Sequence, residues 1–255
     1  MGYETLLVEK NNAIATVKFN RLEKMNAASP QVFRDLYAAL DELNEDPEVK
    51  VLVLTGQDKT FSAGADLGHL DFYNNPRVGF DFIKLVTKAF RKFEEIDKPI
   101  IAAVNGYAFG FGTEITLVCD IAFASDRAQF GLKEVTHGAV PVVALSRGRS
   151  VMLKHHLAYI AMTGETLSAQ EAKEAGLVTR VIPHEQLMEE TYKVAERIAQ
   201  NGPLALEYIK RMLTTGTDAD YRRSIEVCTG VFVTEDLKEG RTAFQERRKP
   251  VFKGR

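Results

Sequence analysis

The chain has 255 residues, 45% of them apolar and 27% charged, a composition typical of a globular protein with one large core. Its 33 basic and 35 acidic residues give a net charge of −2, which excludes a global positive field for nucleic acid or an anionic membrane. Two cysteines, Cys119 and Cys228, are too few for a disulfide framework and fit a reducing compartment. The N-terminal stretch MGYETLLVEKNN lacks the pattern of a secretory signal, and no apolar run approaches the roughly 20 residues that span a bilayer. We therefore expect a soluble, cytoplasmic protein.

The first half of the chain predicts strands that alternate with helices. A hairpin opens it, with strands over 6–9 and 13–19 joined at Asn11–Asn12. Ser29 and Pro30 have the residue types of an N-cap and a first helical position, and apolar residues at helical spacing follow to about Asn44. The later predicted elements are a strand over 50–55, a helix over 77–96, and strands over 99–104 and 119–124. This order is typical of an α/β core.

After about residue 140 the pattern becomes mostly helical. Helices are predicted over 152–162, 168–178, 187–200, 203–213 and 218–235, with a brief strand over 178–182. Gly176 ends the second of these helices. We therefore divide the chain into a core over 1–195 and a helical C-terminal region over 196–255.

The stretch from Asn105 to Gly138 holds a candidate reaction centre. Gly110 and Gly112 precede Glu114 at the start of a predicted helix, and a second acidic residue, Glu134, follows an apolar run. Glycine permits positive φ and close approach of the backbone to a ligand. The N–H groups of a helix's first turn lack helical partners and can point at a developing anion. Two carboxyls in one place can divide acid and base work.

The same residues also have plainer interpretations. Glu114 near a helix start could complement the helix dipole, and Glu134 alone would be a surface charge. His137 fits a polar loop or packing role better than catalysis. The pair His155–His156 lacks a third ligand at metal spacing, so no metal site is predicted. Two glutamates combined with two glycine-rich loops favour catalysis.

Four segments carry the most specific pattern: FSAGADL (61–67), PIIAAVNGYAFGFGTEI (99–115), CDIAFASDRAQFGLKE (119–134) and TGETLSAQEAKEAGLV (163–178). Together they resemble the crotonase superfamily, and within it most closely the enoyl-CoA hydratases. The likeness is collinear over nearly the whole chain, including the closing RKPVFKG. It implies an α/β spiral of ββα turns over 1–195 and a helical trimerisation region over 196–255, assembled as a trimer or hexamer. It also implies a coenzyme A thioester as substrate and no metal or redox cofactor.

The resemblance assigns roles to residues of this chain. The backbone N–H groups of Ala65 and Phe111 would form an oxyanion hole for the thioester carbonyl, and Glu114 and Glu134 would be the catalytic carboxyls. Contacts to the substrate and its coenzyme A would come from Lys24, Ala27, Ala63, Gly64, Asp66, Leu67, Gly68, Gly110, Pro141, Val142, Phe252 and Lys253.

The chemistry implied by the resemblance agrees with the residues. Adding water to a 2-enoyl thioester builds negative charge on the carbonyl oxygen, and losing one preorganised N–H donor typically costs roughly 2.7–4 kcal/mol of barrier. Our hypothesis is that Glu114 deprotonates the water that attacks C3 and that Glu134 delivers the proton to C2. Burial would raise the pKa of at least one of these carboxyls toward neutrality.

Three features depart from the family pattern. Phe111 stands where most relatives have glycine, so its ring needs room and its backbone a negative φ. Pro141 is followed by Val142 and Val143 where hydratases have a glycine-rich run, and these side chains could crowd out the water. Gly68 replaces a lysine near the coenzyme A, which removes one phosphate contact.

Two alternatives therefore stand beside a hydratase. The first is a Δ3,Δ2-enoyl-CoA isomerase, or another CoA-thioester reaction on the same fold, which the two valines favour and Glu114 opposes. The second is an RNA-binding relative, which needs a concentrated basic face. The predicted helix over 77–92 is only mildly basic and the total charge is slightly acidic, so we expect no RNA binding.

Overall fold

The computed structural model describes residues 2–66, 76–137, 139–214, 235, 239, 242–243, 246–248 and 250–255. For residues 76–80, 137 and 142 it describes the backbone alone. The helix predicted over 218–235 lies outside the described residues except for Glu235.

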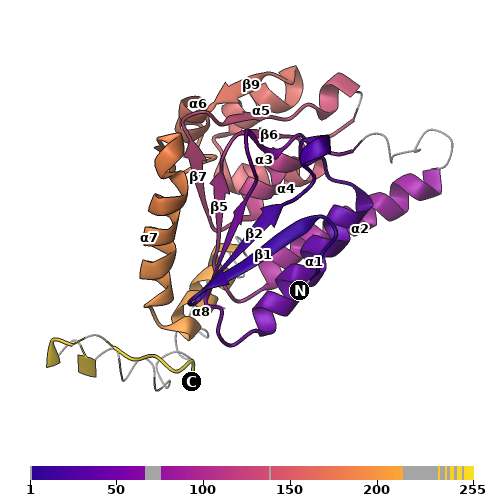
Figure 1. Cartoon of the computed structure of the whole chain (residues 1–255). Helices are drawn as coiled ribbons and strands as arrows, with labels where there is room; N and C mark the ends of the chain where they lie inside the picture. Colours follow the sequence, from indigo (N-terminus) through magenta and orange to yellow (C-terminus); the bar gives the residue numbers. More distant parts are fainter. Residues whose placement is uncertain are drawn as a thin grey trace.

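Six strands form the main sheet, in the order β1-β2-β3-β5-β7-β10 (Figure 1). They are β1 (Leu6–Asn11), β2 (Ile14–Phe19), β3 (Val51–Thr55), β5 (Ile100–Val104), β7 (Ile121–Ser125) and β10 (Arg180–Ile182). The first two form an antiparallel hairpin, and every later pair is parallel. Every residue of β3 and β5 is buried, as expected for parallel strands covered on both faces. The strands predicted from the apolar runs are confirmed.

A second sheet runs beside the first in the order β4-β6-β8-β9. Its strands have three residues each: β4 (Thr60–Ser62), β6 (Tyr107–Phe109), β8 (Gln129–Gly131) and β9 (Thr166–Ser168). Three successive units, β3-β4-α2, β5-β6-α3 and β7-β8-α4, each give one strand to each sheet and then a helix. The predicted spiral of ββα turns is confirmed.

Helices complete the chain (Figure 1). They are α1 (Pro30–Glu45), α2 (Pro76–Glu95), α3 (Phe111–Val118), α4 (Val142–Val151), α5 (Lys154–Thr163), α6 (Ala169–Glu174), α7 (Leu187–Ala199) and α8 (Pro203–Thr214). Short 3₁₀ turns lie at η1 (Leu22–Lys24), η3 (Glu134–His137) and η4 (His184–Gln186). Helix α4 was not predicted, because its two leading valines and Gly148 are poor helix formers. Met152 and Leu153 separate it from α5, which starts later than predicted. None of the helices in the described part of the chain is long and apolar enough to cross a bilayer.

The core lies on both faces of the main sheet. Along β3, Leu52 and Leu54 join a large buried cluster that includes the inner faces of α1, α2 and α3. Val51 and Val53 point the other way, into a smaller cluster that α7 covers (Figure 1).

Two lysines close the amino end of the main sheet. Lys98 Nζ donates to the carbonyl oxygens of Leu43 (2.7 Å) and Asp46 (2.5 Å) at the end of α1, and burial lowers the pKa of this ammonium. Lys210 of α8 is only 3% exposed; it donates to Lys98 O (2.9 Å) and pairs with Asp120 Oδ2 (3.0 Å). These bonds hold α8 against the amino end of the main sheet.

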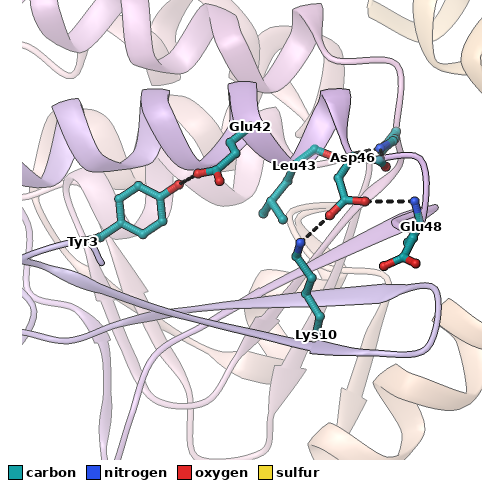
Figure 2. A network of polar contacts seen from close by, with 7 residues as sticks. Tyr3, Lys10, Glu42, Leu43, Asp46 and Glu48 are labelled. Atoms are coloured by element: carbon teal, nitrogen blue, oxygen red, sulfur yellow. Dashed lines mark hydrogen bonds and ion pairs between the residues drawn. The ribbon is translucent and has the colours of Figure 1, made fainter. Parts of the chain in front are cut away.

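Figure 2 shows how the N-terminal segment is held against the end of α1. The Tyr3 hydroxyl donates to Glu42 (2.5 Å), and Lys10 pairs with Asp46, which also accepts from the Glu48 N–H (2.9 Å). Burial, together with the hydrogen bond to Glu42, raises the pKa of Tyr3. This network fixes the edge hairpin and contains none of the predicted site residues.

Candidate active site

The first glycine turn follows β4. Gly64 has φ +107°, a conformation open to glycine, and a Cβ atom there would lie 3.2 Å from Phe109 O. Around it, the Ala28 N–H donates to Gly64 O (2.7 Å) and the Asp66 N–H donates to Ala28 O (3.0 Å). In such a parallel bridge the two residues that flank Ala65 make the bonds, so the Ala65 N–H points away from Ala28.

The second turn joins β6 to α3. The left-handed backbone falls on Gly110 (φ +49°), and Phe111 is the first residue of α3, where an N–H has no partner within the helix. The Phe111 ring is buried and meets three other rings edge to face, those of Phe19, Phe33 and Phe90. The phenylalanine is therefore accommodated by the core, and glycine takes the unusual φ one residue earlier.

The two turns and one of the glutamates are in contact. A Cβ atom at Gly110 would lie 3.6 Å from the Cα of Gly64 and 2.7 Å from Oε1 of Glu134. Glu134 reaches this point from the first position of η3. A Cβ atom would be crowded at both glycines, and both have a positive φ, so glycine suits these two positions.

Glu114 lies on α3, one turn beyond Gly110, and is only 7% exposed. Its Oε1 accepts two hydrogen bonds of 3.0 Å, from the N–H groups of Val143 and Ala144 in the first turn of α4. Burial, with a smaller contribution from the charge of Glu134, raises the pKa of this carboxyl to about 7 against the opposing effect of the two N–H bonds. The Val143 side chain belongs to the large core cluster, so this valine supplies an N–H to the glutamate while its side chain fills the core.

The loop after β2 lies against the first turn. Arg21 pairs with Asp66 (3.0 Å) and donates to Ala27 O (2.5 Å), and Lys24 stands exposed at the end of η1. The Ala63 N–H also bonds into this loop. The sequence analysis missed Arg21, because its partner is 45 residues away and no local pattern connects them.

Other predicted contacts lie elsewhere. Leu67 and Gly68 are outside the described residues, and Pro141 precedes α4, with Val142 as its first residue. Phe252 packs beside Gly202, between α7 and α8, and Lys253 is exposed next to it. This is the amino end of the main sheet, opposite the two turns, and Figure 1 shows the C-terminus beside α8. The structure therefore does not bring Phe252 and Lys253 to the turns of their own chain.

Comparison with known proteins settles the family. A family model described as "Enoyl-CoA hydratase/isomerase" matches residues 9–255. The chain belongs to the enoyl-CoA hydratase/isomerase family. It is 37% identical to a crotonyl-CoA hydratase of Syntrophomonas wolfei subsp. wolfei over 258 residues, which cover 99% of both chains. It is 36% identical over 260 residues to a mitochondrial enoyl-CoA hydratase of Pongo abelii, covering 99% of this chain and 89% of that protein. The crystal structure of an enoyl-CoA hydratase from Bacillus anthracis matches with a TM-score of 0.93 at 32% identity, over 99% of this chain and 100% of that one.

The likeness to the crotonase superfamily is therefore confirmed, and the protein is an enzyme of the hydratase/isomerase family. Its candidate site joins a buried carboxyl, Glu114, and a half-buried one, Glu134, to two glycine turns, a set suited to acid–base work beside a carbonyl group. Within the described residues, no group of three or more His, Cys, Asp or Glu side chains is placed to hold a metal ion.

Proposed function

We propose that this protein adds water across the 2,3 double bond of a 2-enoyl-CoA thioester, or catalyses the reverse dehydration. The observation that carries the proposal is the contact between the two glycine turns and Glu134, with Glu114 buried one turn further along α3. The N–H groups of Ala65 and Phe111 would hold the thioester oxygen as it gains negative charge. Coenzyme A enters as part of the substrate, and the proposed steps use no separate cofactor.

The two glutamates would divide the proton transfers. The pKa of Glu114, which burial and the charge of Glu134 raise to about 7, allows this carboxyl both protonation states near neutrality. Glu114, in its ionised form, would take a proton from the water whose oxygen bonds to C3. Glu134, in its protonated form, would give its proton to C2 as the enolate collapses. Return of the proton from Glu114 to Glu134 would reset the pair.

An isomerase remains the second candidate. It would use Glu134 to move one proton from C2 of a 3-enoyl thioester to C4, and it would have no need of Glu114. The hydrogen bonds from Val143 and Ala144 support the hydratase, because α4 holds the second carboxyl in place in spite of the valines. RNA binding has no comparable support.

We also propose that the protein is a homo-oligomer in which a second copy covers the face formed by α4 and α5. Large apolar side chains are exposed there, including Val140 (59%), Leu145 (40%) and Met162 (77%), around an apolar cavity of about 390 Å³. Phe252 and Lys253 lie at the far end of their own sheet, so any contact of theirs with coenzyme A has to come from a neighbouring copy. In light scattering, the Met162→Glu variant should have a lower molar mass than the wild-type oligomer. A molar mass equal to that of wild type would contradict this interface.

The hydration proposal is tested with purified protein and crotonyl-CoA, by following the loss of the conjugated thioester absorbance. Wild type should remove the absorbance rapidly, and Glu114→Gln should reduce the rate by about 10²-fold or more. Glu165→Gln, at an exposed glutamate, serves as the matched control and should keep the wild-type rate. Absorbance that stays unchanged, with a 3-enoyl-CoA converted to the conjugated 2-enoyl form, would identify an isomerase instead.

A further inference from the structure

Thr113 is a fully buried polar side chain next to Glu114, and the proposed reaction does not use it. It lies in the first turn of α3, and its hydroxyl makes three hydrogen-bond contacts outside the helix, of which the longest is to Gly131 O (3.2 Å). It donates to Ala108 O in β6 (2.6 Å) and accepts from the Gly131 N–H at the end of β8 (3.0 Å). A buried hydroxyl with both partners satisfied joins these segments at fixed distances.

Both backbone groups of Gly131, at the end of β8, are bonded to the segment that contains the second glycine turn and the start of α3. While its N–H donates to Thr113, its carbonyl accepts from the Gly110 N–H (2.8 Å). The ladder between β6 and β8 continues this contact, with Phe109 opposite Gly131. The turn that precedes Phe111 and the strand that leads to Glu134 are thus tied together at one point.

The short connection from Gly131 to Glu134 has little freedom. Leu132 is fully buried, and Lys133 Nζ donates to Gly164 O (2.6 Å) and to Thr166 Oγ1 (2.7 Å). A displacement of Gly131 would therefore be passed to Glu134, whose Oε1 already lies against Gly110.

We propose that Thr113 is a positioning residue for the reaction: its hydroxyl sets the place of Glu134 relative to the oxyanion turn and to Glu114. The inference rests on the proposed acid–base role of Glu134. Misplacement of a reacting group by about 1 Å can lower a rate by about 100-fold. Without the hydroxyl, the Gly131 N–H and the Ala108 carbonyl lose their shared partner, and only the ladder and the Gly110 N–H bond still join β6 to the end of β8.

The same helix provides a matched control. Thr116 is also buried, but its hydroxyl donates only to Thr113 O (2.6 Å), within α3 itself. Thr113→Val and Thr116→Val therefore both replace a buried hydroxyl with a methyl group. Only Thr113→Val removes hydrogen bonds between α3 and the strands β6 and β8. Thr113→Ser keeps the hydroxyl and should rescue the function.

The experiment measures kcat and KM for 2-enoyl-CoA hydration and for 3-enoyl-CoA isomerisation in each variant, together with the melting temperature. Thr113→Val should lower kcat by about 10- to 100-fold with KM within about twofold of wild type, since coenzyme A contacts are untouched. Thr113→Ser and Thr116→Val should stay within about twofold of wild type. If Thr113→Val does not yield folded protein, Thr113→Cys, which keeps the volume with a weaker donor, takes its place.

A double variant separates positioning from loss of stability. In a Glu134→Gln background, Thr113→Val should cost little further activity, because the group that it positions no longer transfers a proton. Equal losses in both backgrounds, or a Thr116→Val loss as large as that of Thr113→Val, would overturn the inference. A wild-type protein that isomerises 3-enoyl-CoA but does not hydrate 2-enoyl-CoA would contradict the proposed function. The Thr113 and Thr116 variants would then be compared by their isomerisation rates.

Discussion

The two ends of the main sheet treat buried charge in opposite ways. At the amino end, Lys210 is buried against the opposite charge of Asp120, and the half-buried Lys98 donates to carbonyl oxygens. At the carboxyl end, two carboxyls of like charge lie close together, and the charge of the half-buried Glu134 raises the pKa of the buried Glu114. Opposite charges that satisfy one another hold elements together, whereas like charges buried together lower the stability of the doubly ionised form.

This difference separates residues that stabilise the fold from residues to which the proposed reaction assigns proton transfers. A variant at the amino end should lose stability and keep the activity of each folded molecule. A variant at the carboxyl end should lose activity and keep, or gain, stability. Three measurements test the comparison, beginning with the largest expected effect.

Glu134→Gln should lower kcat for the preferred enoyl-CoA by about 10³-fold, because the amide cannot deliver a proton. Its melting temperature should equal or exceed that of wild type, since one of two like charges is removed. Steady-state kinetics and calorimetry on the same preparations measure both quantities. Turnover close to that of wild type would remove Glu134 from the mechanism.

Lys210→Met should destabilise the protein by about 4 kcal/mol, because it leaves the Asp120 carboxylate without its buried counter-charge. Denaturant titration measures the free energy of unfolding, and kcat per folded molecule should stay unchanged. The neighbouring Arg211→Met is the control: its partners Asp97 and Glu207 form half-exposed pairs, so its loss should be below about 1 kcal/mol. Equal losses in the two variants would mean that the buried pair has no special weight.

Because the pKa of the Glu114 carboxyl is raised in the folded protein, the free energy of unfolding should fall as pH rises. The pKa of Glu114 rises from 4.5 to about 7 on folding, so between these values the native state binds more protons than the unfolded state. The contribution of this group to stability is therefore fully present below pH 4.5 and is lost as pH rises through 7, by at most about 3 kcal/mol. Glu114→Gln should remove this slope, measured as the free energy of unfolding at pH 5 and pH 8. If Glu114→Gln leaves the slope of unfolding free energy against pH unchanged, other groups cause that slope.

The sequence predicts the main sheet well because β3 and β5 are continuous apolar runs bounded by polar residues. The second sheet was not predictable in this way, since strands of three residues are too short to show a period. Helix α4 begins with poor helix formers, and the N–H groups of its first turn donate to Glu114, a partner from another part of the chain that no local pattern shows.

The candidate site was predictable in its parts and unpredictable in its connections. Glycine spacing and the family resemblance pointed to Gly64, Gly110 and both glutamates. Thr113 gave no indication of a role, because a threonine in an apolar helix resembles a filler of the core. Its significance depends on Gly131, which pairing of β6 and β8 brings beside it.

The ββα units also determine how the site is divided along the chain. The turn at Gly64 belongs to the unit of β3 and β4, Gly110 and Glu114 to that of β5 and β6, and Glu134 to that of β7 and β8. The first unit thus contributes a turn, the second a turn and a carboxyl, and the third a carboxyl, to a site that no single unit contains. A substitution within one unit can therefore alter its part of the site while the parts built by the other two units stay in place.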